Sequence, residues 1–576
     1  MRVELAPPGE RIVFEDPSLV VRIERGDDVD AAFATLDAAL AAGNAIAGYV
    51  TYELGAALAG AAIGDGAVPR DATLPLAAFG IYAAARLVRA PASNGGAFEL
   101  SPPVALWSRR RYDDELARIA ATLRAGDAYQ INLTVPFGFA WDGEPRAMFD
   151  ALVARAGVAH AALVEDGDRA FVSLSPELFL GIAGDRIETR PMKGTTAPGA
   201  TAALGDAKNR AEHVMIVDLL RNDLHRVCDR VRVEQLFAIE RYPTFATMTS
   251  TIAGTLRTGV GLGELLRATF PCGSITGAPK LAAMRTIAEL EAEPRGIAMG
   301  AIGALEAGRR GAFNVAIRTL DLDRRTRLGT LRIGGGIVAD SDASAEWAEI
   351  FVKRRVFLGG EPLAIFETLR VDAAPEDVAA HLARMCDSAD RLGLPYDVSD
   401  VHATLRAAAT GVTRKHAAMP TLARVTLHAT GATTVAMREL DPTPKLVRVV
   451  VTAATVRAND PLLRHKTSRR AAYDLAFREA RARGAFEGLL LNDLGEIADG
   501  ARTTLFVRRA AGEPFVTPSL ACGALAGILR AEMLHDGTAV EGVVLPAELQ
   551  NAVDVRLGNA ARGLCEAIPD ERAPYV

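Results

Sequence analysis

Lysine is scarce in this chain. Of its 65 basic residues only seven are lysine, and the rest are arginine. A sequence that uses arginine for ordinary positive charge keeps lysine where an amine is needed, because a buried amine can lose its proton and attack carbon whereas a guanidinium stays charged. Each lysine is therefore a candidate for chemistry. They are Lys193, Lys208, Lys280, Lys353, Lys415, Lys445 and Lys466.

Cysteines are also few, and long apolar runs are missing. The five cysteines are scattered and never form a C-x-x-C pair, which argues against a disulfide framework or a zinc site and favours a reducing cytoplasm. No apolar run reaches membrane-spanning length, so we expect no membrane association. A net charge of -6 with a pI near 6.0 gives no strongly basic face, so nucleic acid is not an expected partner.

The length of 576 residues exceeds what one hydrophobic core supports, so we expect more than one domain. The pattern of strands and helices breaks at Gly359-Gly-Glu-Pro362. We predict a first domain over residues 1–358, a linker over 359–362 and a second domain over 363–576. Neither a P-loop nor a dinucleotide-binding glycine fingerprint occurs in the chain.

Two residues of the first part stand out. Lys193 follows a strand-like run over 186–190 and precedes a Gly-Thr turn, where the plain interpretation is a surface lysine. Glu177 lies in a predicted strand over 171–180 that Pro176 interrupts. A proline inside a strand implies an edge or a bulge, and a bulge re-aims side chains. Glu177 is thus either an exposed edge charge or an acid aimed into a site.

Three further acids allow two interpretations. Glu346 and Glu349 lie three residues apart on a predicted helix, with Lys353 four residues further on the same face. Glu212 stands near the start of a helix predicted over 209–223. The plain interpretation is helix-stabilising charge. The alternative is a site for a hard cation such as Mg²⁺, which takes few protein carboxylates and leaves positions for water and substrate oxygens.

Three segments could receive an anionic ligand. The loop over 270–280 is rich in glycine and hydroxyls and leads into a helix, whose first N–H groups can seat a carboxylate. A strand predicted over 331–338 contains three consecutive glycines, which let another group approach the backbone closely. A strand predicted over 313–320 carries Arg318 among apolar neighbours.

In their order, these motifs resemble those of the chorismate-utilising enzymes, and within them component I of aminodeoxychorismate synthase. The resemblance covers about residues 105–358. It rests on Tyr129-Gln-Ile-Asn-Leu133, Ser175-Pro-Glu177, Pro191-Met-Lys-Gly-Thr195, Glu212-His213, Asp218-Leu-Leu-Arg-Asn-Asp223, Gly273-Ser-Ile-Thr-Gly-Ala-Pro-Lys280, Ile317-Arg-Thr319 and the segment 334–353. It implies an α+β domain, a β-sheet sandwich with outer helices.

The resemblance also implies roles for individual residues. Lys193 would attack C2 of chorismate and expel the C4 hydroxyl, ammonia would add at C4, and Glu177 would act as general acid/base. The implied Mg²⁺ ligands are Glu212, Glu346 and Glu349. The implied substrate-binding residues are Gly194, Thr195, Thr276, Gly277, Arg318, Gly335 and Gly336. Ala298 departs from the family, which often has tyrosine there, and the strand over 242–251 lacks a histidine that relatives carry.

The second part, over about 363–576, resembles the fold-type IV pyridoxal-phosphate enzymes, close to aminodeoxychorismate lyase and to branched-chain and D-amino-acid transaminases. This implies an α/β domain of two subdomains. Lys466 matches the lysine that binds the cofactor covalently, and Arg384 the phosphate-binding arginine. Asp499 stands where the family usually has the glutamate that pairs with the pyridine nitrogen, with Glu496 as the alternative. The remaining implied cofactor residues are Thr504, Gly527, Ile528 and Leu529.

Together the two resemblances suggest two consecutive steps, amination of chorismate and then pyridoxal-phosphate-dependent loss of pyruvate to give 4-aminobenzoate. The alternatives are a transaminase in the second part, an anthranilate synthase in the first, and a second part that only scaffolds an amidotransferase. The chain has no Gly-x-Cys-x-Gly glutaminase motif, so we expect a separate glutamine amidotransferase subunit to supply ammonia. A homodimer through the second part is a further expectation.

Overall fold

The computed structural model describes residues 1–60, 73–83, 86–89, 96–196, 199, 201–360, 362–410 and 420–570. The chain forms two compact units. The first comprises Met1–Leu100, Arg110–Phe137 and Trp141–Leu358, and the second comprises Ser101–Arg109, Gly138–Ala140 and Gly359–Val576. Within the predicted linker over 359–362, Glu361 lies outside the described residues.

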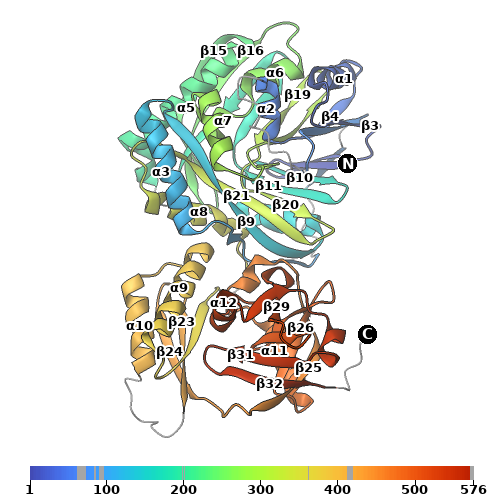
Figure 1. Cartoon of the computed structure of the whole chain (residues 1–576). Helices are drawn as coiled ribbons and strands as arrows, with labels where there is room; N and C mark the ends of the chain where they lie inside the picture. The colour runs from blue at the N-terminus through green and yellow to red at the C-terminus, as the bar shows by residue number, and fades with distance from the viewer. Residues whose placement is uncertain are drawn as a thin grey trace. The chain divides into compact units, whose positions relative to one another are not determined.

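Two large, mostly antiparallel sheets form the first unit (Figure 1). The first sheet has the order β17 (Gly277–Ala278), β9 (Gln130–Gly143), β21 (Leu328–Ile337), β20 (Thr319–Asp323), β11 (Arg169–Ser175), β10 (His160–Asp166), β1 (Arg2–Ala6), β2 (Glu10–Phe14) and β6 (Arg86–Arg89), and β7 (Phe98–Leu100) also pairs with β9. The second has the order β14 (Met192–Thr196), β16 (Ala246–Leu256), β13 (Arg186–Arg190), β12 (Leu178–Ala183), β19 (Arg310–Val315), β18 (Ala301–Glu306), β4 (Ala45–Val50), β5 (Ala77–Tyr82) and β3 (Leu19–Ile23), and β15 (Cys228–Arg241) pairs with β16.

The apolar faces of the two sheets interdigitate. Tyr49 of the second sheet contacts Phe171 of the first, with ring centroids 4.9 Å apart, and Tyr82 contacts Phe14 at 5.5 Å. All four rings are almost completely buried. Burial of alternating side chains from two facing sheets is the packing that defines a sandwich, so the fold class predicted for this part is confirmed.

Helices cover the outside of this sandwich (Figure 1). They are α1 (Val29–Ala41), α2 (Glu53–Ala59), α3 (Arg109–Ala125), α4 (Pro145–Ala156), α5 (Ala207–His225), α6 (Leu262–Thr269), α7 (Lys280–Leu290) and α8 (Ala343–Arg354). Aspartate side chains cap α1, α5 and α8, each accepting a backbone N–H of the first turn. In α8 the buried face carries Trp347, Ile350 and Phe351, which leaves Glu346 and Glu349 on the other side.

Two predicted strands prove to be two strands each. The run over 171–180 contains the end of β11 and the start of β12, which lie in different sheets, so Pro176 and Glu177 form a crossover rather than a bulge. The run over 313–320 likewise passes from β19 to β20, and Arg318 lies in that crossover with a φ of 50°. Alternating apolar residues look the same on both sides of such a change of sheet, so the sequence pattern did not reveal it.

The second unit has two sheets of its own (Figure 1). The first is β22 (Ile365–Arg370), β23 (Thr421–Leu427) and β24 (Thr433–Glu439), against which α9 (Pro375–Leu392) and α10 (Val398–Thr410) pack. The second has the order β27 (Ile497–Gly500), β26 (Glu487–Asn492), β25 (Leu446–Val456), β32 (Gly563–Pro569), β31 (Asp554–Asn559), β28 (Thr504–Arg508), β29 (Phe515–Pro518) and β30 (Ala539–Gly542). Helices α11 (Ala471–Ala482) and α12 (Ile528–His535) pack on it.

Each sheet of this unit has its own apolar core, one beneath α9 and α10 and one within the larger sheet. The two-subdomain α/β fold predicted for this part is therefore confirmed. Within the described part of the chain, every helix is too short or too polar to cross a membrane.

Candidate active sites

The two sheet crossovers of the first unit hold each other in place. Val315, at the end of β19, donates its backbone N–H to the carbonyl of Glu177 at 3.1 Å. Leu174, near the end of β11, donates its N–H to the carbonyl of Arg318 at 3.0 Å. The β11–β12 crossover is thus bonded to β19, the strand that leads into the β19–β20 crossover. The β19–β20 crossover is bonded in the same way to β11. Both backbones are fixed where Glu177 and Arg318 leave the sheets.

The Glu177 carboxyl is buried, with 3% of the residue exposed. Ser274, in the short helical turn Gly273–Ile275, donates its hydroxyl to Glu177 Oε1 at 2.6 Å. Burial raises the pKa of Glu177 to about 7, while the hydrogen bond from Ser274 and the charge of Lys193 act in the opposite direction. A carboxyl with such a pKa can give or take a proton near neutral pH.

Lys193 lies on β14, whose pairing with β16 shifts by one residue at Gly194. Gly194 has a φ of 71°, which favours glycine, and Thr247 holds its carbonyl with a 2.7 Å hydrogen bond. The Lys193 amine donates to Gln130 Oε1 at 3.2 Å. Burial lowers the pKa of Lys193, and Lys353 lowers it further, whereas Glu212, Glu177 and Glu349 oppose the shift. The uncharged amine is therefore favoured more than in water.

Of the three consecutive glycines of β21, Gly336 lies against this lysine. A methyl group on Gly336 would lie 2.9 Å from Lys193 Nζ and 2.7 Å from Gln130 Nε2. A methyl group on Gly335 would lie 3.2 Å from Glu346 Oε2, and one on Gly334 would collide with the backbone of β9. The close approach that this glycine run was expected to allow is thus made by the chain's own groups, and at Gly336 these are the lysine and the glutamine.

The predicted metal ligands are electrostatically coupled. The pKa of Glu346 is raised by burial and also by Glu349 and Glu212, so the three acids influence one another. Lys353 donates to Glu349 Oε1 at 2.8 Å and to the carbonyl of Gly334 at 2.7 Å, and it lowers the pKa of Glu349. Among the described residues no three His, Cys, Asp or Glu side chains are grouped to hold a metal ion.

Carboxylate oxygens are the donors that Mg²⁺ prefers, so the chemistry of these side chains fits that ion. The chemistry of the donors therefore suits the ion, whereas their positions in the described structure do not form a ligand set. A cation at Glu349 would compete with Lys353 for the same carboxylate. The Mg²⁺ site therefore stays a prediction.

The remaining predicted substrate-binding residues lie on neighbouring elements. Thr195 is half-buried on β14. Thr276 is fully buried, and its hydroxyl donates to the carbonyl of Cys272 at 2.9 Å, so in this structure it stabilises the loop. Gly277 lies in β17, where a methyl group would come within 2.2 Å of the carbonyl of Gln130. The Arg318 guanidinium is buried over the ring of Phe245, 4.0 Å from its centroid.

Four residues at this site were not assigned from the sequence. Gln130 bonds Lys193, Ser274 bonds Glu177, and Lys353 bridges Glu349 to β21. His213 of α5 reaches β16 instead, where its Nε2 lies 2.6 Å from Ser250 Oγ. Burial and Lys193 lower the pKa of His213 to about 4, so its ring is neutral. The scarcity of lysine could have indicated a role for Lys353. The polar side chains on one face of β9, which begins at Gln130, could have indicated Gln130.

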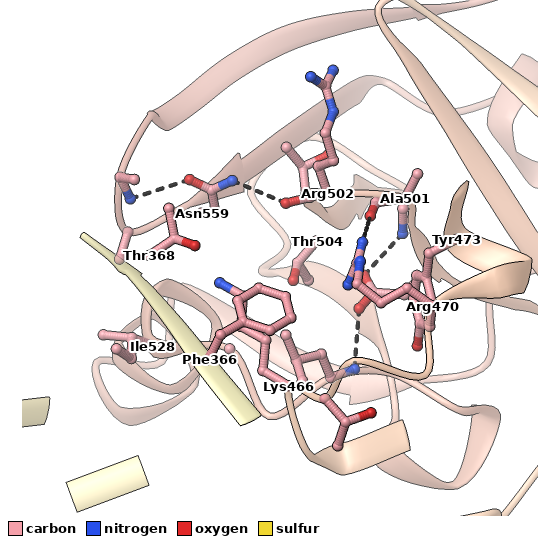
Figure 2. A pocket seen from close by; sticks show the side chains of 18 of the residues that line it. Phe366, Thr368, Lys466, Arg470, Tyr473, Ala501, Arg502, Thr504, Ile528 and Asn559 are labelled. Carbon is pink, nitrogen blue, oxygen red and sulfur yellow. Dashed lines mark hydrogen bonds between the residues drawn. The ribbon is translucent and has the colours of Figure 1, made fainter. Parts of the chain in front are cut away.

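A pocket of about 310 Å³ opens in the second unit. Figure 2 shows Lys466, Phe366 and Thr504 around it, with Ile528 on one side and Arg470 and Tyr473 on the other. Burial lowers the pKa of Lys466 to about 7, and neighbouring arginines add to the shift. The lysine predicted to bind the cofactor therefore carries an amine that is about half neutral at pH 7.

Arg384 is held from two sides. Its Nε and Nη2 donate to Glu367 at 2.8 and 2.5 Å, and its Nη1 donates to the carbonyl of Ala526 at 3.0 Å. His381 also contacts Glu367, through Nδ1 at 2.7 Å. Because Ala526 immediately precedes Gly527, this cluster ties α9 to the start of α12.

The start of α12 fits a phosphate group. Gly527 is its N-cap and has no side chain to bond the first-turn N–H groups, and Gly527, Ile528 and Leu529 line the pocket, so those N–H groups are available to an anion there. Thr504 also lines the pocket, and its hydroxyl would lie 3.5 Å from a methyl group on Gly527. Arg384 also lines the pocket, but Glu367 balances its charge in this structure, so the start of α12 supplies the positive potential there.

Asp499 is the better placed of the two candidate acids. It lines the pocket and is buried, accepting N–H groups of Gly500 and Leu525 at 2.9 and 3.0 Å. Burial raises its pKa to about 7. Glu496 instead accepts the side-chain amide of Asn492 at 2.8 Å within a turn. An acid, an amine and an anion seat around one cavity suit pyridoxal phosphate, so the residues fit the cofactor.

Two arginines line the mouth of this pocket on one face of the small sheet. In the pairing of β23 with β24, Arg424 lies opposite Ala436 and Arg438 opposite Leu422, so the two arginines are diagonal neighbours. Arg424 stacks on Phe366, 3.6 Å from the ring centroid, and its pKa is lowered first by burial and further by Arg470 and Arg438. Like charges at this distance destabilise one another unless an anion lies between them.

Comparison with known proteins agrees with this geometry. Residues 8–359 match the model of the chorismate binding enzyme family, and residues 364–567 match that of the class IV amino-transferases. Aminodeoxychorismate synthase component 1 of Salmonella typhimurium is 38% identical over 259 residues, which cover 43% of this chain and 56% of that protein. Anthranilate synthase component 1 of Haloferax volcanii is 36% identical over 255 residues, 42% of this chain and 49% of that protein.

The chain therefore spans about half the length of the curated relatives it matches. A crystal structure of anthranilate synthase component I from Streptococcus pneumoniae superposes with a TM-score of 0.53 at 25% identity, covering 61% of this chain and 92% of that one. The second unit has the fold-type IV architecture that its class IV amino-transferase match indicates. With a family match over more than half of its residues, this chain belongs to the chorismate binding enzyme family.

Proposed function

We propose that the first unit converts chorismate and ammonia to 4-amino-4-deoxychorismate, and that the second unit removes pyruvate from this product to give 4-aminobenzoate, a folate precursor. The observation that carries the proposal is the pair of Lys193 and Glu177. A half-buried amine with a lowered pKa is electrostatically coupled to a buried carboxyl with a pKa of about 7. The lowered pKa of the amine and the raised pKa of the carboxyl both favour the uncharged forms, which are a nucleophile and a proton donor.

In the first step the neutral amine of Lys193 attacks C2 of chorismate, and the ring double bonds shift so that the C4 hydroxyl leaves. Glu177 gives its proton to that hydroxyl, which departs as water. Ammonia then adds at C4, the double bonds shift back and Lys193 leaves C2 as the neutral amine, taking the electron pair of the C–N bond. The ammonium group formed at C4 gives its extra proton to the Glu177 carboxylate, which restores the acid. Arg318 and the N–H groups of β14 would bind substrate carboxylates, since a buried guanidinium is a strong anion receptor.

Glu212, Glu346 and Glu349 would hold Mg²⁺, which would neutralise a carboxylate of the substrate when bound. The two lysines near these acids, Lys193 and Lys353, would then feel less negative charge. Because Glu212 and Glu349 oppose the lowered pKa of Lys193, a cation bound to them would favour the neutral amine further.

In the second unit, Lys466, Arg384, Asp499 and the start of α12 would hold pyridoxal phosphate, which supplies an electron sink for the carbon that bears the substrate amine. Asp499 would face the ring nitrogen and hold a proton there. Lys466, about half neutral at pH 7, would accept the proton released from the substrate carbon. Phe366 and Tyr473 exclude water from part of the cavity.

The basic mouth of the second pocket favours a substrate with two carboxylates. Arg424 and Arg438 are diagonal neighbours on one strand pair, and Arg470 influences Arg424 from across the cavity. 4-Amino-4-deoxychorismate carries two carboxylates, whereas branched-chain amino acids carry one. This observation supports a lyase over an aliphatic transaminase.

Ammonia would come from free ammonium or from a separate glutamine amidotransferase subunit, because the sequence has no glutaminase cysteine motif. A homodimer formed through the second unit belongs to the same proposal. A cytoplasmic location agrees with five free cysteines in the structure.

The test compares wild type with Lys193→Ala, Lys466→Ala and the exposed-lysine control Lys445→Ala. Each protein is incubated with chorismate, ammonium, Mg²⁺ and pyridoxal phosphate, and the products are separated by chromatography. We expect Lys193→Ala to make no aminodeoxychorismate and Lys466→Ala to accumulate it without forming 4-aminobenzoate. Lys445→Ala should match wild type.

Other outcomes would assign other functions. Wild-type formation of 2-aminobenzoate would indicate anthranilate synthase. Product formation by the second unit only when an amino acceptor is added would indicate a transaminase, since pyruvate release by a lyase needs none. Normal 4-aminobenzoate formation by Lys466→Ala would exclude the second unit as the lyase.

A further inference from the structure

Ser274 lies between two other groups in the first active site. Its hydroxyl is 2.6 Å from Glu177 Oε1 on one side and 3.2 Å from Cys272 Sγ on the other. All three residues are buried, with 6% of Ser274 exposed. The loop that carries Ser274 is fixed by the hydroxyl of Thr276, which donates to the carbonyl of Cys272. Ser274 is therefore held at hydrogen-bonding distance from the carboxyl.

A hydroxyl at this position can serve both forms of the acid, because it has one proton and two lone pairs. When Glu177 is ionised, Ser274 donates to it. When Glu177 is protonated, the carboxyl O–H can donate to Ser274 Oγ, and the serine proton can turn toward the sulfur of Cys272. Burial raises the pKa of the Cys272 thiol to about 12, so the thiol stays neutral and does not compete for the proton.

We propose that Ser274 is a positioning residue that keeps Glu177 able both to give and to take its proton, by reversing the direction of their hydrogen bond. The inference rests on the proposed amination of chorismate, in which Glu177 must lose a proton and regain it in every turnover. It adds a named residue to that reaction and a reason for a serine at this place in the glycine-rich loop.

The charged and titratable groups that act on Glu177 are few in the described structure. Lys193 approaches from β14 and favours the ionised carboxyl, as does the backbone N–H of Met192. The Cys272 thiol approaches from the same loop as Ser274. Against these, burial favours the protonated form. Loss of the Ser274 hydroxyl removes the nearest donor to the ionised form and should raise the pKa of Glu177.

The experiment is an infrared titration of the buried carboxyl, with the Glu177 band identified by its loss in Glu177→Gln. Wild type should titrate near pH 7. Ser274→Ala should titrate about one pH unit higher, because the hydrogen bond from Ser274 to the ionised carboxyl is stronger than the hydrogen bond with the protonated one. Ser274→Thr, which keeps the hydroxyl, should restore the wild-type midpoint. Ser274→Cys, a weaker donor of similar size, should lie between them.

Turnover gives a second readout. Glu177 must be protonated to expel the hydroxyl, so the rate falls as pH rises through its pKa. In Ser274→Ala the falling limb of kcat should move upward by the same amount, with KM for chorismate unchanged. Thr286→Ala, which removes a hydroxyl from α7, should change neither quantity.

An unmoved infrared midpoint in Ser274→Ala would overturn the proposal. If that variant does not fold, an unmoved midpoint in Ser274→Cys would do so. The titration does not depend on turnover. If wild type makes no aminodeoxychorismate, the proposed function fails, while the infrared midpoints still decide whether Ser274 controls the proton of Glu177.

Discussion

Replacing Gly336 with alanine should impair the first reaction by displacing the nucleophile. A methyl group at this position would lie 2.9 Å from Lys193 Nζ and 2.7 Å from Gln130 Nε2. Both neighbours are ends of flexible side chains, and the φ of Gly336 lies outside the left-handed region, so the backbone accepts alanine. The strain is therefore relieved by moving the amine and the amide rather than by unfolding.

The size of the effect follows from the contact distances. Non-bonded heavy atoms pack at about 3.5 Å or more, so the amine must retreat by roughly 0.6 Å. Misplacing a reacting group by about 1 Å costs about a hundredfold in rate. We expect a fall of about 30- to 100-fold in kcat for aminodeoxychorismate formation, or roughly 2 to 2.7 kcal/mol in activation free energy. The free energy of unfolding should change by less than about 1 kcal/mol.

The assay follows aminodeoxychorismate by chromatography with saturating ammonium, beside urea unfolding of the same protein. Gly205→Ala is the matched control, because a methyl group there meets nothing within 4 Å. A Gly336→Ala protein with the wild-type rate would refute the reasoning, since it would show that the Lys193 amine is not placed against β21 during turnover.

Three further predictions follow from buried charges. Glu291→Gln should lower the free energy of unfolding by about 3 to 5 kcal/mol in urea titrations, because it leaves the buried Arg295 and Arg332 without their shared carboxylate. The control Glu293→Gln, at an exposed carboxylate, should change that free energy by no more than about 0.5 kcal/mol. Capture of pyridoxal phosphate by Lys466 in the cofactor-free protein should become faster with rising pH and level off near pH 7, since the neutral amine predominates above that value. The rate is followed by absorbance. A continued rise toward pH 10 would contradict the lowered pKa of Lys466. Arg384→Ala should weaken pyridoxal phosphate binding about 10- to 100-fold by equilibrium dialysis, the loss of one charge-assisted contact, and unchanged binding would remove Arg384 from the phosphate site.

The helices were predictable because their signals are local. The helix expected over 209–223 is α5, Ala207–His225, and its boundaries are set by a capping aspartate and a short apolar stripe. The strands expected over 171–180 and 313–320 were wrong in a specific way. Each is two strands in different sheets, because strand partners are chosen by contacts far apart in the sequence, which a periodic pattern does not record.

The same limit applies to the site. Lys193 stood out because lysine is scarce, and the resemblance supplied Glu177. Their partners Gln130 and Ser274 lie 63 and 97 residues away in the chain, and only the folded structure places them at hydrogen-bonding distance. The three consecutive glycines showed that something approaches the backbone but not what. The structure shows the side chains of Gln130 and Lys193 at Gly336, Glu346 at Gly335 and the backbone of β9 at Gly334.

The sheet crossovers explain why this architecture suits the proposed chemistry. A side chain within a strand points either into the core or to solvent, whereas one at a crossover can point into the space where the two sheets separate. Glu177 and Arg318 both occupy such positions, and the reciprocal hydrogen bonds from Val315 and Leu174 fix their backbones. A buried acid held this way keeps a raised pKa because neither it nor its neighbours can relax toward water. The reactivity of Glu177 therefore depends on the sandwich as a whole, and a substitution that loosens either crossover should alter its pKa without touching the substrate.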